Sequence, residues 1–275
     1  MSHLKIKIAV GGLNITPIVR NLLIMNVAVF LAAALLNRVE LFSEWFGLRA
    51  FISPFFSPYQ IFTYMFMHGG WQHLIFNMMG LIFLGPLLET VWGQQRFLFF
   101  FIFTGIGAGL VDAAANSYEL SAVLADGRIF LQDPTPDNYV QFLGKHYPDG
   151  IFNQEQFIAS FEKDPHNQTY IRETTNFVRK FDNMIANRVS VGASGAIFGL
   201  MTALGLLFPN TELMLLFLPI PIKAKYFVLL SAAFAVFMIM RRDSSDNVAH
   251  FAHLGGMLFA WIIISFWNKQ RTKFW

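Results

Sequence analysis

The sequence has no cysteine and few charged residues, and both absences narrow the class of protein. Without cysteine the chain can form neither a disulfide nor a thiolate nucleophile. Only 13% of its 275 residues are charged, against about 25% in a typical soluble domain, while 55% are hydrophobic. The composition therefore predicts an integral membrane protein. The net charge of +3 is small, and we expect no nucleic-acid partner.

Six apolar runs are long enough to cross a hydrocarbon core of about 30 Å, which takes roughly 20 helical residues. They cover residues 18–37, 72–92, 97–117, 191–208, 224–240 and 247–267. The first run begins well after Lys5 and Lys7 and lacks a small-residue cleavage site after it, so we interpret it as a membrane span and not as a signal peptide. The expected fold class is an all-α, multi-pass membrane protein with six transmembrane helices.

Basic residues in short loops indicate which way such a bundle faces, because they are enriched on the cytoplasmic side. Six spans place both termini on one side. That side would carry Lys5, Lys7, Arg20, Arg96, Lys223, Lys225, Lys269, Arg271 and Lys273, and the other only Arg38, Arg49, Arg241 and Arg242. We therefore expect cytoplasmic termini, in lipid of a bacterial inner membrane.

A long segment of mixed polarity divides the chain. Residues 1–118 would hold helices 1–3 with a first outer loop at 38–71, and residues 191–275 would hold helices 4–6 of the same membrane domain. Residues 119–190 form the expected extramembrane insertion on the outer side, between the third and fourth helices. Its second half has helical spacing in Phe157, Ile158 and Phe161 and in Phe177, Val178, Phe181 and Ile185. We expect two amphipathic helices there; whether they contact the membrane, the site, a partner or nothing stays open.

Two apolar connections contain prolines. The first outer loop includes Phe51 to Met67 with Pro54 and Pro58, which we expect to lie in the membrane interface or to dip partway into the bilayer. The segment P219-I-P-I-K-A-K225 indicates a short reentrant or interfacial piece on the cytoplasmic side.

Polar side chains at membrane depth are costly and are therefore candidates for function. They are His73, Asn77, Asp112, Ser194, His250 and His253. Ser194 lies about four residues into the fourth run and His253 about six residues past Asn247, so at about 1.5 Å per residue both are roughly 5 to 10 Å below the outer surface. His73 and Asn77 open the second run from the same side, on one helix face.

A hydroxyl, an imidazole and two hydrogen-bond donors at one level fit acyl transfer. Ser194 would attack a carbonyl, His253 would take and return its proton, and donors would stabilise the oxyanion, aided by the free N–H groups at a helix start. No acid completes a triad. A dyad suffices if something else orients the imidazole, and Phe198, one turn after Ser194, could stack on it.

Other interpretations of these residues compete with catalysis. Gly195 and Gly199 in the fourth run, with Gly256 and Ala260 in the sixth, are spaced for helix packing. His250 lies three residues before His253 and is a rival base.

Histidines at one level could also bind a metal, but no H-E-x-x-H motif is present, and we expect no metal and no cofactor. Asp112 is the single membrane aspartate, so the aspartyl type of protease is excluded; it pairs with an arginine of the insertion or helps to hydrate the site. Glu89 and Arg96 are expected to pair at the cytoplasmic turn.

Jointly, three motifs resemble the rhomboid family of intramembrane serine proteases. They are G192-A-S-G195, A252-H-L-G-G256 and H73-L-I-F-N77, supported by T63-Y-M-F-M-H68, G85-P-L-L-E89 and the segment 219–225. The resemblance covers most of a six-helix core. It implies a rhomboid-like bundle that cleaves transmembrane protein substrates near the outer leaflet, with entry past the fifth helix.

By position, the resemblance implies Ser194 as nucleophile and His253 as general base and acid. The oxyanion hole would consist of the His73 and Asn77 side chains with the Ser194 backbone N–H. Supporting positions are Phe198, Gly192, Gly195 and Gly256. The chain departs from the family in lacking a Trp-Arg pair in the first outer loop and in the size of its insertion. A rhomboid-like protein that binds membrane helices without cutting them is the alternative; a transporter is less well supported, because no inverted repeat is visible.

Overall fold

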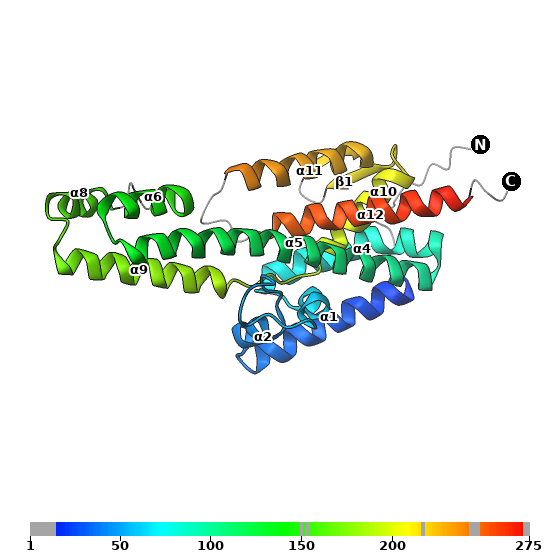
Figure 1. Ribbon diagram of the computed structural model, residues 1–275. Coiled ribbons are helices and arrows are strands. Elements are labelled where there is room, and N and C mark those ends of the chain that lie inside the picture. Colours follow the sequence, from blue (N-terminus) through cyan, green and yellow to red (C-terminus); the bar gives the residue numbers. More distant parts are fainter. Residues whose placement is uncertain (1–14, 149–150, 152–153, 216–217, 242–247, 272–275) are drawn as a thin grey trace.

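One long helix connects the two parts of the molecule. In the computed structural model, which describes residues 15–148, 151, 154–215, 218–241 and 248–271, helix α5 (Gln94–Gln132) has 39 residues and so extends for about 58 Å. Its first part lies in a helical bundle and its last part in a smaller lobe (Figure 1). The start of α1 (Pro17–Leu35) and the end of α12 (His250–Arg271) lie at the end of the bundle away from the lobe.

The bundle contains the predicted apolar runs. Five helices are long and apolar enough to cross a membrane: α1, α4 (Trp71–Trp92), α5, α11 (Ala224–Arg241) and α12. The expected fourth span is a shorter apolar helix, α10 (Ser194–Leu207), of 14 residues. Ten of these residues are buried, from Gly195 to Gly205, so α10 lies inside the bundle with its neighbours around it.

The start of α10 differs from the prediction. Residues 191–193 are not helical, because Gly192 has a φ of 118° and donates its N–H to the carbonyl of Tyr64. Ser190, two residues before Gly192, pairs with Leu48 through two backbone hydrogen bonds of 2.8 Å. The helix therefore begins at Ser194 itself and not at residue 191, where the apolar run begins.

The lobe consists of the C-terminal part of α5 from Tyr118 together with α6 (Pro136–His146), α8 (Glu155–Lys163) and α9 (Gln168–Ala186). The first 14 residues of the expected insertion thus continue the third bundle helix. The two amphipathic helices predicted in its second half are confirmed as α8 and α9. The lobe has a second core, which also includes Ala50 of the first outer loop; its lobe members are Leu120, Val123, Phe130, Tyr139, Phe142, Leu143, Ile158, Val178 and Ile185.

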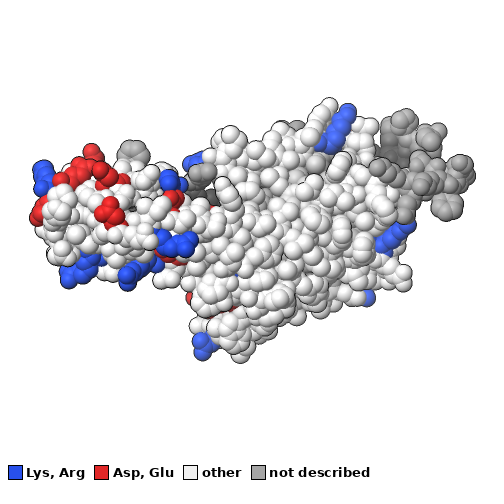
Figure 2. Space-filling view, in the orientation of Figure 1, with Lys and Arg blue, Asp and Glu red and all other residues white. Residues whose placement is uncertain are grey.

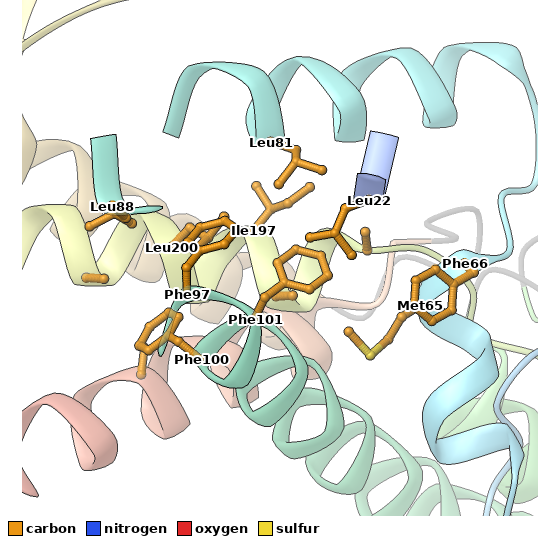
Figure 3. Packing of buried hydrophobic residues seen from close by; sticks show 14 of the residues in the cluster. Leu22, Met65, Phe66, Leu81, Leu88, Phe97, Phe100, Phe101, Ile197 and Leu200 are labelled. Carbon is orange, nitrogen blue, oxygen red and sulfur yellow. The ribbon is translucent and has the colours of Figure 1, made fainter. Parts of the chain in front are cut away.

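The bundle core is built from large apolar side chains of several helices. Figure 3 shows Leu22 from α1, Leu81 from α4, Phe97 and Phe101 from α5 and Ile197 from α10 packed together. All five side chains are buried. The outer surface of the bundle is also apolar: in Figure 2 charged side chains gather on the lobe and at the opposite end, and the broad face between them is almost free of them. Such a band suits a hydrocarbon environment.

Small residues allow three bundle helices to approach closely. A Cβ at Gly256 of α12 would overlap the Gly195 carbonyl of α10, so the predicted contact between these glycines is confirmed. A Cβ at Gly199 would lie 2.8 Å from Thr104 Cβ of α5. Gly199 therefore packs against α5 and not, as predicted, against the helix of Gly256.

The first outer loop is tied to the lobe. It contains α2 (Val39–Phe46), α3 (Gln60–Thr63) and a 3-10 turn, η1 (Tyr64–Phe66). The buried Arg49 donates to the Asn187 carbonyl over 2.7 Å, and Ser53 donates to the Ala186 carbonyl over 2.8 Å. Both acceptors end α9, so the loop holds the end of the lobe beside the chain that leads into α10.

At the opposite end, Glu89 is buried at the C-terminal end of α4. Its carboxylate accepts the backbone N–H groups of Ile18 and Val19, each over 3.0 Å, and so caps the start of α1. Arg96 instead places its guanidinium 5.4 Å from the centroid of the Trp267 ring. The two side chains form no ion pair among the described residues, so the predicted Glu89–Arg96 pair is wrong.

A small hairpin interrupts the helices before α11. Strands β1 (Glu212–Leu215) and β2 (Leu218–Lys223) are antiparallel, with Glu212 opposite Lys223. The segment 219–225 thus forms most of β2 and the first turn of α11. The fold is mostly helical, as predicted, but this strand pair was not expected.

Candidate active site

Ser194 and His253 come together inside the bundle. Ser194 is the first residue of α10, and His253 lies in the first turn of α12. The Ser194 Oγ and His253 Nε2 atoms are 2.9 Å apart, a hydrogen-bond distance. His253 is buried and Ser194 is half-buried. The two residues are 59 positions apart in the sequence, so the contact depends on the packing of α10 against α12.

Aromatic neighbours surround the His253 imidazole. The Phe198 ring lies parallel to it, with ring centroids 4.0 Å apart and planes inclined by 7°. His250, the rival base, is also buried; its ring is perpendicular to that of His253, with centroids 5.9 Å apart. The geometry thus places Nε2 of His253 at the Ser194 hydroxyl and His250 behind it.

His73 and Asn77, from the first two turns of α4, border the loop before Ser194. A Cβ at Gly192 would lie 2.6 Å from His73 Nε2 and 3.7 Å from Asn77 Nδ2. Asn77 Nδ2 donates one hydrogen bond to the His73 carbonyl over 2.8 Å, which engages one of its two amide hydrogens. Glycine at position 192 therefore does two things: it adopts a φ that other residues avoid, and it leaves room for the imidazole.

A second imidazole lies behind His73. His68 is 3% exposed, and its ring meets the His73 ring edge to face with centroids 5.2 Å apart. His68 ends the motif T63-Y-M-F-M-H68, and the sequence favours a packing residue at the mouth of the site over a catalyst; its buried ring against His73 agrees with packing.

Asp112 is the residue for which the sequence left two roles open, pairing with an arginine of the insertion or hydrating the site. It is buried in α5, accepts a hydrogen bond from Asn116 Nδ2 over 3.0 Å, and contacts the Ser190 hydroxyl and the Ala252 backbone N–H. Arg188 is the arginine whose charge acts on Asp112, but its ion pair is with Glu119, over 2.8 Å. Asp112 thus contacts Ala252, which directly precedes His253, and Ser190, which lies four residues before Ser194.

No group of three or more metal-ligating side chains occurs within the part of the chain that the structure describes. The described site therefore contains a hydroxyl, an imidazole at hydrogen-bond distance, and amide and imidazole groups beside the glycine that precedes the hydroxyl. These groups are sufficient in kind for nucleophilic attack on a carbonyl with proton transfer.

Several membrane-length apolar helices enclosing such a polar site define a multi-pass integral membrane protein. Comparison with known families identifies which kind. A model of the Rhomboid domain matches residues 56–127 and 171–269, well over half of the 275 residues, and the chain belongs to the rhomboid family. This family consists mostly of serine proteases and acts on transmembrane substrates in membranes. Between the two matched stretches, the described residues of 128–170 belong to the lobe.

Individual relatives match over shorter stretches. The chain is 36% identical over 86 residues to Rhomboid protein 1, mitochondrial, of Saccharomyces cerevisiae, covering 30% of this chain and 25% of that protein. It is 35% identical over 72 residues to Rhomboid-like protein 11, chloroplastic, of Arabidopsis thaliana, covering 26% of each. It is 31% identical over 72 residues to the putative rhomboid protease YdcA of Bacillus subtilis, covering 26% of this chain and 36% of the relative. These matches span only about a quarter to a third of the relatives' lengths.

Proposed function

We propose that this chain is an intramembrane serine endopeptidase that hydrolyses peptide bonds in or next to the transmembrane segments of membrane proteins. The observation that carries the proposal is the distance of 2.9 Å between Ser194 Oγ and His253 Nε2. At this distance a neutral imidazole can accept the hydroxyl proton directly.

In the proposed reaction Ser194 Oγ adds to the carbonyl carbon of the scissile bond while its proton moves to His253 Nε2. Collapse of the tetrahedral intermediate breaks the C–N bond, and the proton on Nε2 passes to the leaving amine. Water then attacks the acyl-enzyme with His253 again as base, and the released Ser194 recovers its proton. The stacked Phe198 ring keeps the imidazole in plane through these transfers.

Three donors are available to the developing oxyanion. The Ser194 backbone N–H belongs to the first residue of α10, so it has no acceptor within the helix and lies at the positive end of the helix dipole. The second amide hydrogen of Asn77 and the His73 imidazole border the same loop. Removing one such donor typically costs about 10² to 10³ in kcat.

We also propose how the molecule lies in the membrane. α10 is the fourth of six spans, shorter than the others because it is enclosed by them, and the lobe lies outside the bilayer at the end opposite the start of α1. The apolar band of the bundle and the gathering of charge on the lobe support this arrangement (Figure 2). With basic residues marking the cytoplasmic end, the termini face the cytoplasm of a bacterial inner membrane and the site opens on the outer side.

The test is cleavage of a model transmembrane substrate by purified protein in liposomes. We expect wild type to cut the substrate, and Ser194→Ala and His253→Ala to leave it intact. Equal cleavage by wild type and Ser194→Ala would refute the proposal. Substrate binding by Ser194→Ala, measured in parallel, checks that the variant is folded.

The alternative is a rhomboid-like protein that binds or sorts membrane helices without cutting them. It predicts that wild type and Ser194→Ala bind the same substrates equally well and that neither releases a fragment. The Ser194–His253 contact favours the protease, because a binding function makes no use of a hydroxyl at hydrogen-bond distance from an imidazole.

A further inference from the structure

Asp112 is a carboxyl group buried in the membrane bundle. Its side chain belongs to α5 and the residue is only 2% exposed. Burying a carboxyl away from water is costly unless hydrogen bonds compensate it. Asn116, one turn further along α5, supplies one of them over 3.0 Å. The proposed reaction does not use Asp112 directly, so its other contacts indicate what it does.

One contact is at the start of α12. The first four N–H groups of a helix have no acceptor within it. His250 donates to the Val248 carbonyl and His253 to the Ala249 carbonyl, over 2.9 and 3.2 Å. The N–H of Ala252 meets the carboxyl of Asp112. A carboxyl oxygen at this position can accept a free N–H at the helix start, and Ala252 directly precedes His253.

The other contact is on the chain that leads to Ser194. The Ser190 hydroxyl meets the same carboxyl group. Ser190 is itself fixed by its two backbone hydrogen bonds to Leu48, and Gly192 by its bond to Tyr64. Asp112 therefore contacts the segment before the nucleophile and the helix turn that carries the base.

Close packing of α5 against α10 and α12 near Asp112 couples the positions of the three helices. A Cβ at Gly255 of α12 would lie 2.8 Å from Val111 Cβ and 3.0 Å from Ala108 Cα, both in α5. A Cβ at Gly195 of α10 would overlap Ala108 Cβ and lie 3.3 Å from the Ala252 carbonyl. The three backbones are thus in contact at the level of Asp112, with little room for one helix to shift alone.

The protein uses the same device elsewhere. Glu89, also buried, caps α1 through the N–H groups of Ile18 and Val19. A buried carboxyl from one helix that binds the free N–H groups of another thus occurs at each end of the bundle.

We infer that Asp112 is a positioning residue of the active site: by binding the Ala252 N–H and the Ser190 hydroxyl together, it sets the distance between Ser194 and His253. The inference rests on the proposed function. A displacement of about 1 Å between reacting groups can lower the rate by about 10²-fold. Loss of the two Asp112 contacts therefore lowers the rate of the chemical step and leaves substrate binding largely intact.

The test compares Asp112→Leu, which keeps the branching at Cγ but is larger and has no acceptor, with Asp112→Asn, whose carboxamide oxygen can still accept the Ala252 N–H. We expect Asp112→Leu to lower kcat and the rate of Ser194 labelling by a fluorophosphonate by about 10- to 100-fold, with KM changed less than about twofold. Asp112→Asn should stay within about threefold of wild type. Glu119→Gln removes a carboxylate from the exposed part of the same helix and serves as the matched control.

Amide hydrogen exchange at residues 250–253 gives a readout that needs no activity. Exchange at Ala252 should be faster in Asp112→Leu than in wild type and near wild type in Asp112→Asn. Unchanged exchange in Asp112→Leu, or an equal loss of activity in the two Asp112 variants, would overturn the inference. The proposed function would still stand as long as wild type cleaves substrate and Ser194→Ala does not. Ser190→Ala keeps the contact of Asp112 with α12 and provides a second variant should Asp112→Leu not fold. We expect fluorophosphonate labelling of Ser194 to be two- to fivefold slower in Ser190→Ala. A wild-type labelling rate would overturn the inference that Asp112 positions both segments.

Discussion

The Phe198 ring lies flat on the His253 imidazole, with centroids 4.0 Å apart and an angle of 7° between the planes. Phe198 is on α10, one turn after Ser194, and His253 is on α12. The helix of the proposed nucleophile therefore supplies both the hydroxyl that faces Nε2 and a ring that packs on the imidazole. In the proposed reaction, this ring would orient the imidazole as an acid does in a triad.

Replacing Phe198 tests the stacking contact. An aromatic pair contributes about 0.5 to 1.5 kcal/mol beyond its buried area, so we expect Phe198→Leu to lower kcat by about three- to tenfold. Phe198→Tyr keeps the ring and should remain close to wild type. Steady-state cleavage of a transmembrane substrate measures both variants, and equal activity of Leu and Tyr at this position would count against the orienting role.

Gly192→Ala tests the loop beside the oxyanion hole. Its φ of 118° is strained for alanine, and the added Cβ would lie 2.6 Å from His73 Nε2, so the imidazole must move. We expect kcat to fall by about 10²-fold, as when an oxyanion donor is lost. Gly70→Ala is the matched control, since its Cβ meets nothing within 4 Å. If the two alanine variants cleave substrate equally well, the loop does not set the position of His73.

Arg49→Met tests the link between the first outer loop and the lobe. The buried guanidinium donates to the Asn187 carbonyl over 2.7 Å and to the Glu44 carbonyl over 3.2 Å. Hydrogen bonds from a charged donor contribute about 1.5 to 3 kcal/mol, so amide exchange at the end of α9 should become faster by about 10-fold or more. Arg38→Met, at an exposed position of the same connection, should leave it unchanged. Equal exchange in the two variants would show that Arg49 does not hold the lobe.

The sequence predicted the parts of the fold that depend on composition and periodicity. Of the six apolar runs predicted to span the membrane, five form helices of membrane length and one forms the shorter α10. The spacing of Phe157 to Phe161 and Phe177 to Ile185 predicted α8 and α9. The motifs around Ser194 and His253 predicted these two residues as the candidate dyad. The structure places their side chains in contact.

Several features that the sequence did not predict depend on contacts between elements distant in the chain. The start of α10 moves to Ser194 because Gly192 bonds to Tyr64, and an apolar run by itself contains no sign of that bond. The carboxyls of Glu89 and Asp112 bind helix N–H groups that become neighbours only after packing. Hydrophobic periodicity describes which face of a helix is buried and carries no information about which polar group meets its end.

Asp182 gives the lobe a predictable dependence on pH. It is partly buried in α9, against Gly127 of α5, and burial raises the pKa of its carboxyl above the usual value, with the nearby His146 opposing that shift. The folded lobe thus favours the protonated form, and its stability decreases as pH rises through and above the normal range of an aspartate.

Asp182→Asn cannot ionise and should be more stable than wild type at pH 7, by a few degrees in the midpoint of thermal unfolding. The difference should shrink as the pH is lowered towards 4, where wild type becomes protonated. Asp137→Asn, at an exposed position of α6, is the control. A difference for Asp182→Asn that stays constant between pH 4 and 7 would contradict the assignment.

The most direct test of the central claim is the site and rate of covalent labelling by a fluorophosphonate probe. We predict a single adduct on Ser194, located by mass spectrometry. In His253→Ala the labelling rate should fall by about 10³-fold or more, because the hydroxyl is weakly nucleophilic without its base. His250→Ala should label far faster than His253→Ala. An adduct on another residue, or a wild-type labelling rate in His253→Ala, would contradict the assignment of Ser194 and His253 as the catalytic dyad.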